Sequence, residues 1–154
     1  MEVHQGSELI SIVQLLAGRA EYKRSAYEDI VLNYFGSYKD HPAVKQAAEL
    51  NLMNCDFPLR LSWAFYDFDH IKVQQIETLV GYEDFADIQK IRAFFEACKT
   101  FYFDTHFAEF YERQKPAYAK WVASFEKNLY QDGMFAEIDN FYKLDPGAVT
   151  FTLG

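Results

Sequence analysis

Apolar residues recur every three or four positions along most of this chain, which is the pattern of amphipathic helices. Polar segments with glycine, proline or a capping side chain separate the apolar runs. The pattern predicts a mainly α fold, a multi-helix orthogonal bundle of about seven to eight helices with a short terminal β-strand, in a single domain over residues 1–154. The expected helices begin near Ser7, Ser25, Pro42, Asp56, Val73, Asp84, Thr105 and Met134, and end near Gly18, Gly36, Asn54, Phe68, Gly81, Cys98, Gly133 and Tyr142.

Capping residues mark several of these boundaries. Ser7 precedes an apolar helix face and is expected to cap it through its hydroxyl, while Gly18 supplies a left-handed stop. Ser25 begins a capping box for the second helix. Pro42 suits the first position of the third helix, because its missing amide hydrogen costs nothing there. The fourth helix, 56–68, is apolar on nearly every side, so it is expected to be central in the fold.

The stretch 101–130 organises the predicted fold, because ten of its thirty residues are aromatic. A helix with such a stripe must be covered by other elements. Asp104 or Thr105 is the expected cap of this helix, and Pro116 is expected to break or kink it. The phase of the stripe survives the proline, so both halves should face the same core. The predicted seam comprises Phe103, Phe107, Phe110, Tyr118, Trp121, Phe125 and Leu129.

Residues 148–153 change to an alternating, β-branched pattern after the Asp145-Pro146-Gly147 turn, which predicts a strand. A lone strand needs a neighbour for its backbone groups. The expected neighbour is segment 2–5, the same strand in a second copy of the chain, or a sheet that this chain lacks.

The net charge of −8 and the 50% hydrophobic content are typical of an acidic globular protein. Nucleic acid and anionic membranes attract clustered lysine and arginine, so neither is an expected partner. The acidic charge also favours core packing over base stacking for the aromatic stripe. No apolar run approaches the ~20 residues of a membrane span, and the first residues lack the basic and apolar parts of a signal peptide.

The two cysteines, Cys55 and Cys98, stand far apart in the sequence. Neither belongs to a Cys-x-x-Cys motif, so a metal or redox pair is not expected. Cys98 lies in a helical pattern and is expected to be a buried free thiol, with a disulfide to Cys55 as the alternative.

Few residues are candidates for chemistry. Asp67, Asp69 and His70 are weak candidates for a metal cluster, but their spacing places them on different sides of a helix end, which favours capping and solvation. His41 is either a helix cap or a functional imidazole, and a lone histidine lacks the partners that catalysis requires. His106 is expected to be a polar residue in the first turn of the aromatic helix. Phosphate-loop, nucleophile-elbow and His-Glu-x-x-His motifs are missing, so no catalytic residue is assigned and no cofactor is expected.

The order of these signals resembles an uncharacterised bacterial family classed as a domain of unknown function. The most specific part of the resemblance is Tyr-Lys-Asp-His-Pro-Ala-Val at 38–44, and the resemblance covers nearly all of the chain. It marks Tyr38, Lys39, Asp40 and His41 as a candidate functional surface. The segments that carry it are 8–13, 16–18, 34–44, 107–111, 118–125 and 141–142.

Longer members of that family continue into a sheet and a His-Glu-x-x-His helix, which makes them zinc metallopeptidase-like, and many carry export signals. In such a motif two histidines one helical turn apart hold zinc, and the intervening glutamate acts as base. The motif does not occur before Gly154. The resemblance therefore implies that this chain is the N-terminal part of a longer protein, with zinc only in the longer members.

The leading expectation for function is a non-catalytic helical portion of a metallopeptidase-like protein, either packing support or a wall of the substrate cleft. Its expected partner is its own C-terminal half, or a second copy, through the strand at 148–153. The alternative is a stand-alone helical module that binds a protein or peptide through exposed aromatic residues. A third hypothesis is an enzyme that acts on a small molecule through Asp67, Asp69 or His70.

Overall fold

The computed structural model describes residues 2–18, 27–50, 62, 65–67, 72–73, 88–131 and 152–153. These residues are mainly helical, as the periodicity predicts. The helices are α1 (Gln5–Leu16), α2 (Tyr27–Phe35), α3 (Pro42–Leu50), α6 (Ile88–Asp104) and α7 (Phe107–Gln131), with a 3₁₀ turn at Gly36–Tyr38. The strands are β1 (Glu2–Val3), β2 (Phe65–Asp67), β3 (Lys72–Val73) and β4 (Thr152–Leu153).

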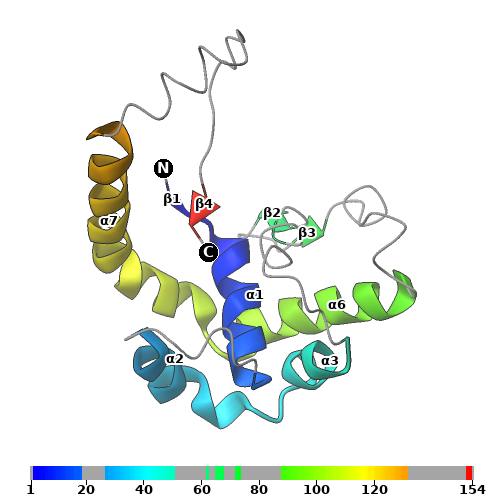
Figure 1. Cartoon of the computed structure of the whole chain (residues 1–154). Coiled ribbons are helices and arrows are strands. Elements are labelled where there is room, and N and C mark those ends of the chain that lie inside the picture. Colours follow the sequence, from blue (N-terminus) through cyan, green and yellow to red (C-terminus); the bar gives the residue numbers. More distant parts are fainter. Residues whose placement is uncertain are drawn as a thin grey trace, which may run out of the picture.

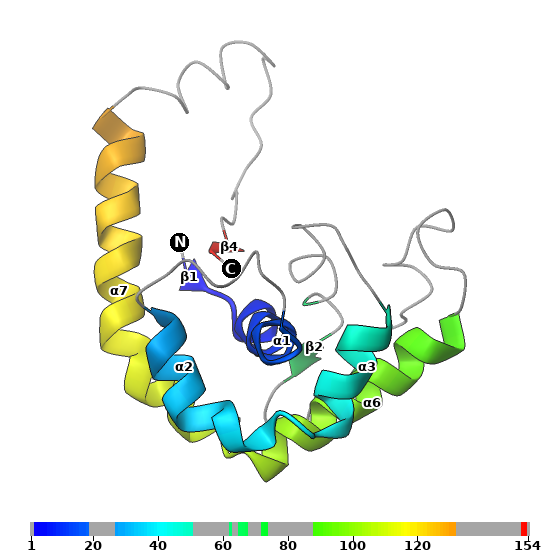
Figure 2. The same ribbon diagram turned by 60° about the horizontal axis from the view of Figure 1, so that its bottom comes forward.

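Helix α1 lies at the centre of the described fold (Figure 1). Viewed nearly along its axis, α1 has α2 and α7 on one side and α3 and α6 on the other (Figure 2). Neighbours on so many sides explain why Ile10 is as deeply buried as Leu9 and Val13, although the sequence predicts only a one-sided apolar face. The central position expected for helix 56–68 is therefore held by α1 within the described residues.

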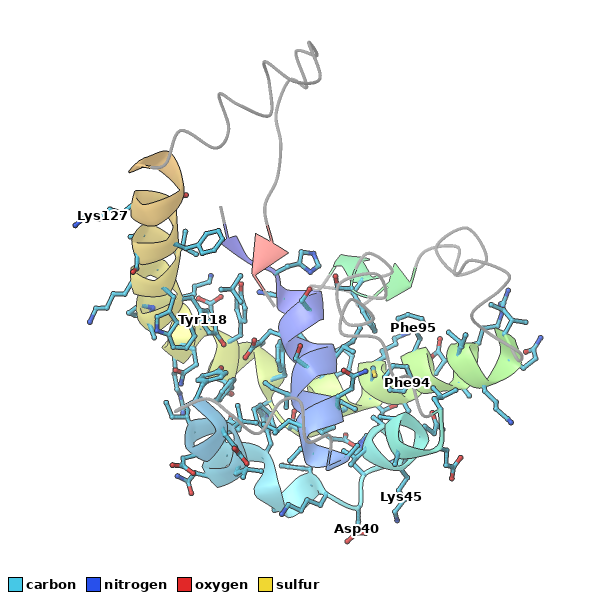
Figure 3. All side chains as sticks on the ribbon, viewed as in Figure 1. Asp40, Lys45, Phe94, Phe95, Tyr118 and Lys127 are labelled. Carbon is cyan, nitrogen blue, oxygen red and sulfur yellow. The ribbon has the colours of Figure 1, made fainter. Side chains whose placement is uncertain are left out.

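The second layer of the core comes from α6 and α7. Phe94 and Phe95 lie on α6, to the side of α1 where α3 lies, and are fully buried (Figure 3). Phe35 at the end of α2 stacks on Phe101 with ring centroids 5.7 Å apart, and it meets Phe110 edge-on at 4.7 Å. Aromatic contacts at such distances contribute about 0.5–1.5 kcal/mol each beyond the area that they bury. The aromatic stretch thus serves core packing over its first half, as expected.

The N-terminus of α1 differs from the prediction. His4, and not Ser7, is the cap, because its Nδ1 accepts the amide hydrogens of Gly6 at 3.1 Å and Ser7 at 3.4 Å. Ser7 is buried one turn into the helix, and its hydroxyl has no hydrogen-bond partner in the described part of the chain. At the other end the prediction is confirmed: Gly18 has φ +86° and its amide bonds to the Leu15 carbonyl at 3.0 Å.

The region after α3 contains strands where helices are expected. Phe65–Asp67 pairs antiparallel with Lys72–Val73, so the helices predicted over 56–68 and 73–81 are wrong at these positions. A short apolar run can be a buried strand or a buried helix, and periodicity alone does not separate the two. Phe65 is fully buried and contacts Phe95 with ring centroids 5.1 Å apart.

The junction between α6 and α7 also differs from the prediction. Thr105 ends α6, because its amide and hydroxyl both donate to the Phe101 carbonyl, the hydroxyl at 2.7 Å. His106 has φ +53° and its carbonyl accepts the amide hydrogens of Glu109 and Phe110, so it precedes the helix and does not lie in its first turn. This interruption breaks the predicted seam, because Phe103 belongs to α6 and is 54% exposed.

Pro116 does not break α7, which continues to Gln131. The axis of α7 changes direction along its length (Figure 1), as a proline inside a helix favours. Pro42 begins α3, as predicted.

Thr152–Leu153 forms β4 and pairs in parallel with Glu2–Val3, which is one of the neighbours expected for the terminal strand. The remaining residues of that strand, 148–151, lie outside the described residues. So do the expected helix at 134–142, Ser25, Asp84, and most of 56–68 and 73–81. The expected count of seven to eight helices is therefore not supported by the described part of the chain.

Candidate functional site

The candidate surface Tyr38–His41 runs from the last residue of the 3₁₀ turn to the residue before α3, against the end of α6. The Tyr38 hydroxyl donates to the Asp104 carbonyl at 3.1 Å, and His41 Nε2 lies 3.4 Å from Asp104 Oδ2. His41 Nδ1 accepts the Ala43 amide hydrogen at 3.1 Å, which confirms the capping prediction for this residue. We call Tyr38, His41 and Asp104 the Asp104 junction.

The Asp104 junction leaves little of His41 for chemistry. Its side chain is only 7% exposed, and its ring meets Phe101 edge-on with centroids 5.1 Å apart. Because Nδ1 accepts a backbone hydrogen, the proton of the neutral ring lies on Nε2, facing Asp104. The junction thus ties the start of α3 to the end of α6 through groups that are already hydrogen-bonded.

The other two residues of the candidate surface face solvent. Lys39 is exposed, and Asp40 pairs with Lys45 at 3.7 Å on the outer side of the molecule (Figure 3). An exposed ion pair of this length contributes little to stability.

The remaining sequence candidates are only partly described. Asp67 lies in β2, with no description of its side chain, and Asp69 and His70 lie outside the described residues. His106 Nδ1 lies 3.7 Å from Glu109 Oε1 at the exposed start of α7. No group of three histidine, cysteine or acidic residues that could hold a metal ion occurs within the described ranges.

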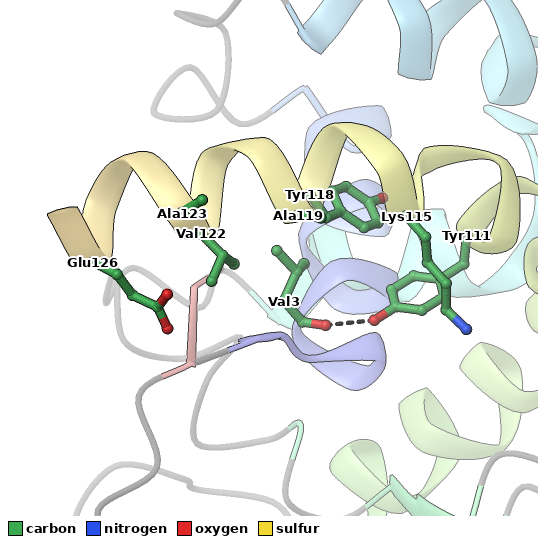
Figure 4. Close-up of a pocket in the computed structure, with 8 residues that line it drawn as sticks. All are labelled: Val3, Tyr111, Lys115, Tyr118, Ala119, Val122, Ala123 and Glu126. Atoms are coloured by element: carbon green, nitrogen blue, oxygen red, sulfur yellow. Dashed lines mark hydrogen bonds between the residues drawn. The ribbon is translucent and has the colours of Figure 1, made fainter.

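A groove of about 370 Å³ runs along one side of α7, facing β1 (Figure 4). We call it the α7 groove. Sequence reasoning did not predict it, because β1 reaches α7 from the other end of the chain. Its lining residues are Val3, Tyr111, Lys115, Tyr118, Ala119, Val122, Ala123 and Glu126.

Backbone and side-chain contacts fix the walls of the α7 groove. The Tyr111 hydroxyl donates to the Val3 carbonyl, which holds β1 against α7 (Figure 4). Lys115 Nζ lies 5.8 Å from the centre of the Tyr111 ring and 2.6 Å from Glu112 Oε1. The floor is therefore apolar, made by valine and alanine, while charged groups stand at the rim.

A buried carboxyl lies behind the groove wall. The Tyr27 and Tyr118 hydroxyls donate to Glu8 Oε1 at 2.7 and 3.1 Å, and the two hydroxyl oxygens lie 2.6 Å apart. Glu8 is only 6% exposed. We call these three side chains the Glu8 cluster; it joins α1, α2 and α7, and Tyr118 belongs both to the cluster and to the groove wall.

Burial changes the acidities in the Glu8 cluster. Burial raises the pKa of the Glu8 carboxyl above its ordinary value of 4.5, although hydrogen bonds from Tyr27 and Tyr118 act in the opposite direction. Burial, and then the charge of Glu8, raise the pKa values of both tyrosines above their usual range. The cluster therefore favours neutral side chains.

Sequence reasoning missed the Glu8 cluster. An acidic residue suits the first turn of a helix, so the position of Glu8 has a sufficient local explanation. A signal was present: Glu8 stands one turn before Ile12, on the same face of α1, so it shares a face that the core covers.

The apolar stripe of α7 is uncovered toward its C-terminal end. Trp121 is 45% exposed and Phe125 is 40% exposed, whereas Phe107, Phe110 and Tyr118 are buried. Trp121 still contacts Tyr27 edge-on, with ring centroids 5.3 Å apart. The prediction that both halves of the aromatic stretch face the same core is thus confirmed only as far as Tyr118.

Comparisons with protein-family models, curated proteins and solved structures give no match for this chain. Of the helices that the structure describes, none combines the length and the apolar character needed to cross a membrane.

Proposed function

We propose that this chain is the non-catalytic helical portion of a metallopeptidase-like protein and that it supports the fold and walls a cleft. The main support for the proposal is the structural role of the segment at 38–44, which is the most specific part of the family resemblance. Tyr38 and His41 make packing and capping contacts at the Asp104 junction. Because their polar atoms already have hydrogen-bond partners, Tyr38 and His41 are suited to stabilise the fold.

The α7 groove supports the same proposal. It presents an apolar floor between charged rims, and the contact of Tyr111 with Val3 fixes its width at one end. An apolar floor between polar rims is suited to hold an extended or helical segment of another chain.

Metal analysis and a peptidase assay of the purified chain test the proposal. We expect well under one zinc ion per chain after dialysis against zinc, and no hydrolysis of an unstructured protein substrate above the rate in buffer. Stoichiometric zinc together with cleavage, both lost in a variant with Asp69→Ala and His70→Ala, would refute it. A variant with Asp40→Ala and Lys39→Ala is the matched control, because it also removes one acidic and one basic side chain.

A second candidate function is a helical module that binds an amphipathic peptide helix. The partly exposed Trp121 and Phe125 favour it, because they continue a stripe whose other members are buried. A synthetic peptide with leucine at i, i+3, i+4 and i+7 serves as the probe, and a scrambled peptide as the control. In a Trp63→Phe background Trp121 is the sole tryptophan, so a blue shift of its emission with the first peptide alone would support this function; equal responses to both peptides would exclude it.

A further inference from the structure

The hydrogen bonds of the Glu8 cluster can be counted. Three oxygens, Glu8 Oε1 and the two phenolic oxygens, make three mutual contacts of 2.7, 3.1 and 2.6 Å. Each short oxygen–oxygen contact needs one hydrogen between the two atoms. Tyr27 and Tyr118 supply two hydrogens, because each phenol carries one. With an ionised Glu8, one of the three contacts has no hydrogen, and two oxygens face each other through lone pairs.

A proton on Glu8 Oε1 supplies the third hydrogen. Glu8 then donates to Tyr118, which reverses the bond that Tyr118 donates to an ionised Glu8. Tyr118 donates to Tyr27, and Tyr27 donates back to Glu8, so that each oxygen gives one hydrogen and accepts one. Closed rings of this kind strengthen their members, because each donor polarises the next. The neutral acid is therefore the state that satisfies all three contacts.

The surroundings of Glu8 favour the same state. Tyr27 from α2 and Tyr118 from α7 are the titratable side chains that face it, with Tyr111 beside Tyr118. None of the described side chains of α3, α6 or β1 forms an ion pair or hydrogen bond with the carboxyl, and His4 on its own helix faces the amides of Gly6 and Ser7. A buried carboxylate without a cation is costly, and the usual outcome is uptake of a proton.

We propose that Glu8 carries a proton in the folded protein at neutral pH, and that this proton closes a latch between α1, α2 and α7 which opens when the proton is lost at higher pH. Ionisation leaves two oxygens in repulsive contact and places a charge on a side chain that is only 6% exposed. Tyr118 is both a member of the latch and a wall of the α7 groove. Release of Tyr118 therefore changes the shape of the groove, and the protonation of Glu8 controls it.

The pH dependence of unfolding tests the proposal without an adjustable constant. The unfolded chain ionises Glu8 near pH 4.5, whereas the folded chain keeps the proton. Unfolding between pH 5.5 and the folded pKa thus releases one proton, and the unfolding constant of the wild type should rise tenfold per pH unit relative to that of Glu8→Gln. The stabilising contribution of the neutral acid is complete below pH 4.5 and is lost as the pH rises through the folded pKa.

Glu8→Gln keeps an N–H group and a carbonyl oxygen at the same place, but its side chain does not titrate. Glu49→Gln, at an exposed position of α3, is the matched control and should leave the slope of the wild type unchanged. A ratio of wild-type to Glu8→Gln unfolding constants that stays constant from pH 5.5 to 7.5 would overturn the proposal, since it means that Glu8 is already ionised in the folded protein.

A second measurement does not depend on the folding of any variant. Carbon-13 NMR of the wild-type chain, labelled at the glutamate side-chain carboxyl carbons, follows each carboxyl through the pH range. We expect one glutamate carbon to keep the shift of a neutral acid at pH 7 and to titrate above it, together with shifts of the Tyr118 ring signals. Titration of every glutamate carbon below pH 6 would contradict the proposal.

Discussion

The hydroxyl oxygens of Tyr27 and Tyr118 lie 2.6 Å apart, although 91 positions separate the two residues in the chain. This contact joins the first turn of α2 to the middle of α7, and both hydroxyls also reach Glu8 on α1. One carboxyl oxygen thus joins three helices that come from separate segments of the chain. Their relative positions depend on polar groups as well as on the aromatic core.

Removal of one hydroxyl from the Glu8 cluster is expected to destabilise the fold. Tyr27→Phe removes the hydroxyl that contacts both Glu8 and Tyr118. A buried polar group that loses its hydrogen-bond partner lowers the free energy of unfolding by about 1–3 kcal/mol. Urea unfolding followed by circular dichroism measures the change. Tyr34→Phe is the control on the same helix, because the Tyr34 hydroxyl makes only an exposed 3.5 Å contact with the His106 carbonyl; it should change the unfolding free energy by less than about 0.5 kcal/mol. Equal effects of the two substitutions would argue against the cluster.

Gly6 is predicted to tolerate no side chain. A Cβ at this position would lie 2.8 Å from the Ser62 carbonyl oxygen, so Gly6→Ala should displace that backbone and cost about 1–3 kcal/mol. Gly36→Ala is the matched substitution, since no atom lies within 4 Å of its Cβ position; it should be neutral or stabilising by up to about 1 kcal/mol. Thermal unfolding of both variants gives the comparison. A Gly6→Ala variant as stable as Gly36→Ala would show that Ser62 does not approach α1 this closely.

His106 is expected to be strained, because its φ of +53° is unfavourable for a residue with a Cβ. His106→Gly should raise the unfolding free energy by about 0.5–1 kcal/mol, whereas His106→Val should lower it by about 1–2 kcal/mol. Denaturant titration of the two variants measures both changes. Equal stabilities of the His106→Gly and His106→Val variants would contradict the positive φ at this position.

The thiol of Cys98 is expected to react only after unfolding. It is fully buried and free, as predicted from the sequence, and burial raises its pKa well above the ordinary value. A disulfide-exchange reagent at pH 8 should therefore label it at least about 100-fold more slowly in the folded chain than in 6 M guanidinium, because reaction needs an accessible thiolate. Use of a Cys55→Ser variant isolates the signal of Cys98. Labelling at the same rate in both conditions would place the thiol at the surface.

Local signals explain which parts of the fold could be predicted. Gly18 ends α1 and Pro42 begins α3 because the φ angle of a single residue determines each of these boundaries. The apolar spacing of α6 likewise predicts its buried face, where Ile91, Phe95 and Cys98 lie. The spacing of apolar residues in α1 predicts a single buried face, but no local sequence signal shows that neighbouring elements also cover its other sides.

Long-range contacts explain most of the errors. Ser7 has the right side chain for a cap, but Ser62 packs over Gly6 and the helix begins earlier, at Gln5, with His4 as its cap. Phe65 belongs to a strand because of its pairing with Val73. The Glu8 cluster and the α7 groove depend on contacts across 19, 91 and 108 positions, and a periodicity of three or four residues carries no information at that distance.

That the segment at 38–44 supports the fold is tested most directly by the stability of His41→Ala. This substitution removes the cap of α3 and the contact with Asp104, so the free energy of unfolding should fall by about 1–2 kcal/mol. His41→Asn, which retains a capping oxygen, should recover about half of that loss, and Lys39→Ala, at an exposed neighbouring position, should change it by less than about 0.5 kcal/mol. A His41→Ala variant as stable as Lys39→Ala would contradict the claim.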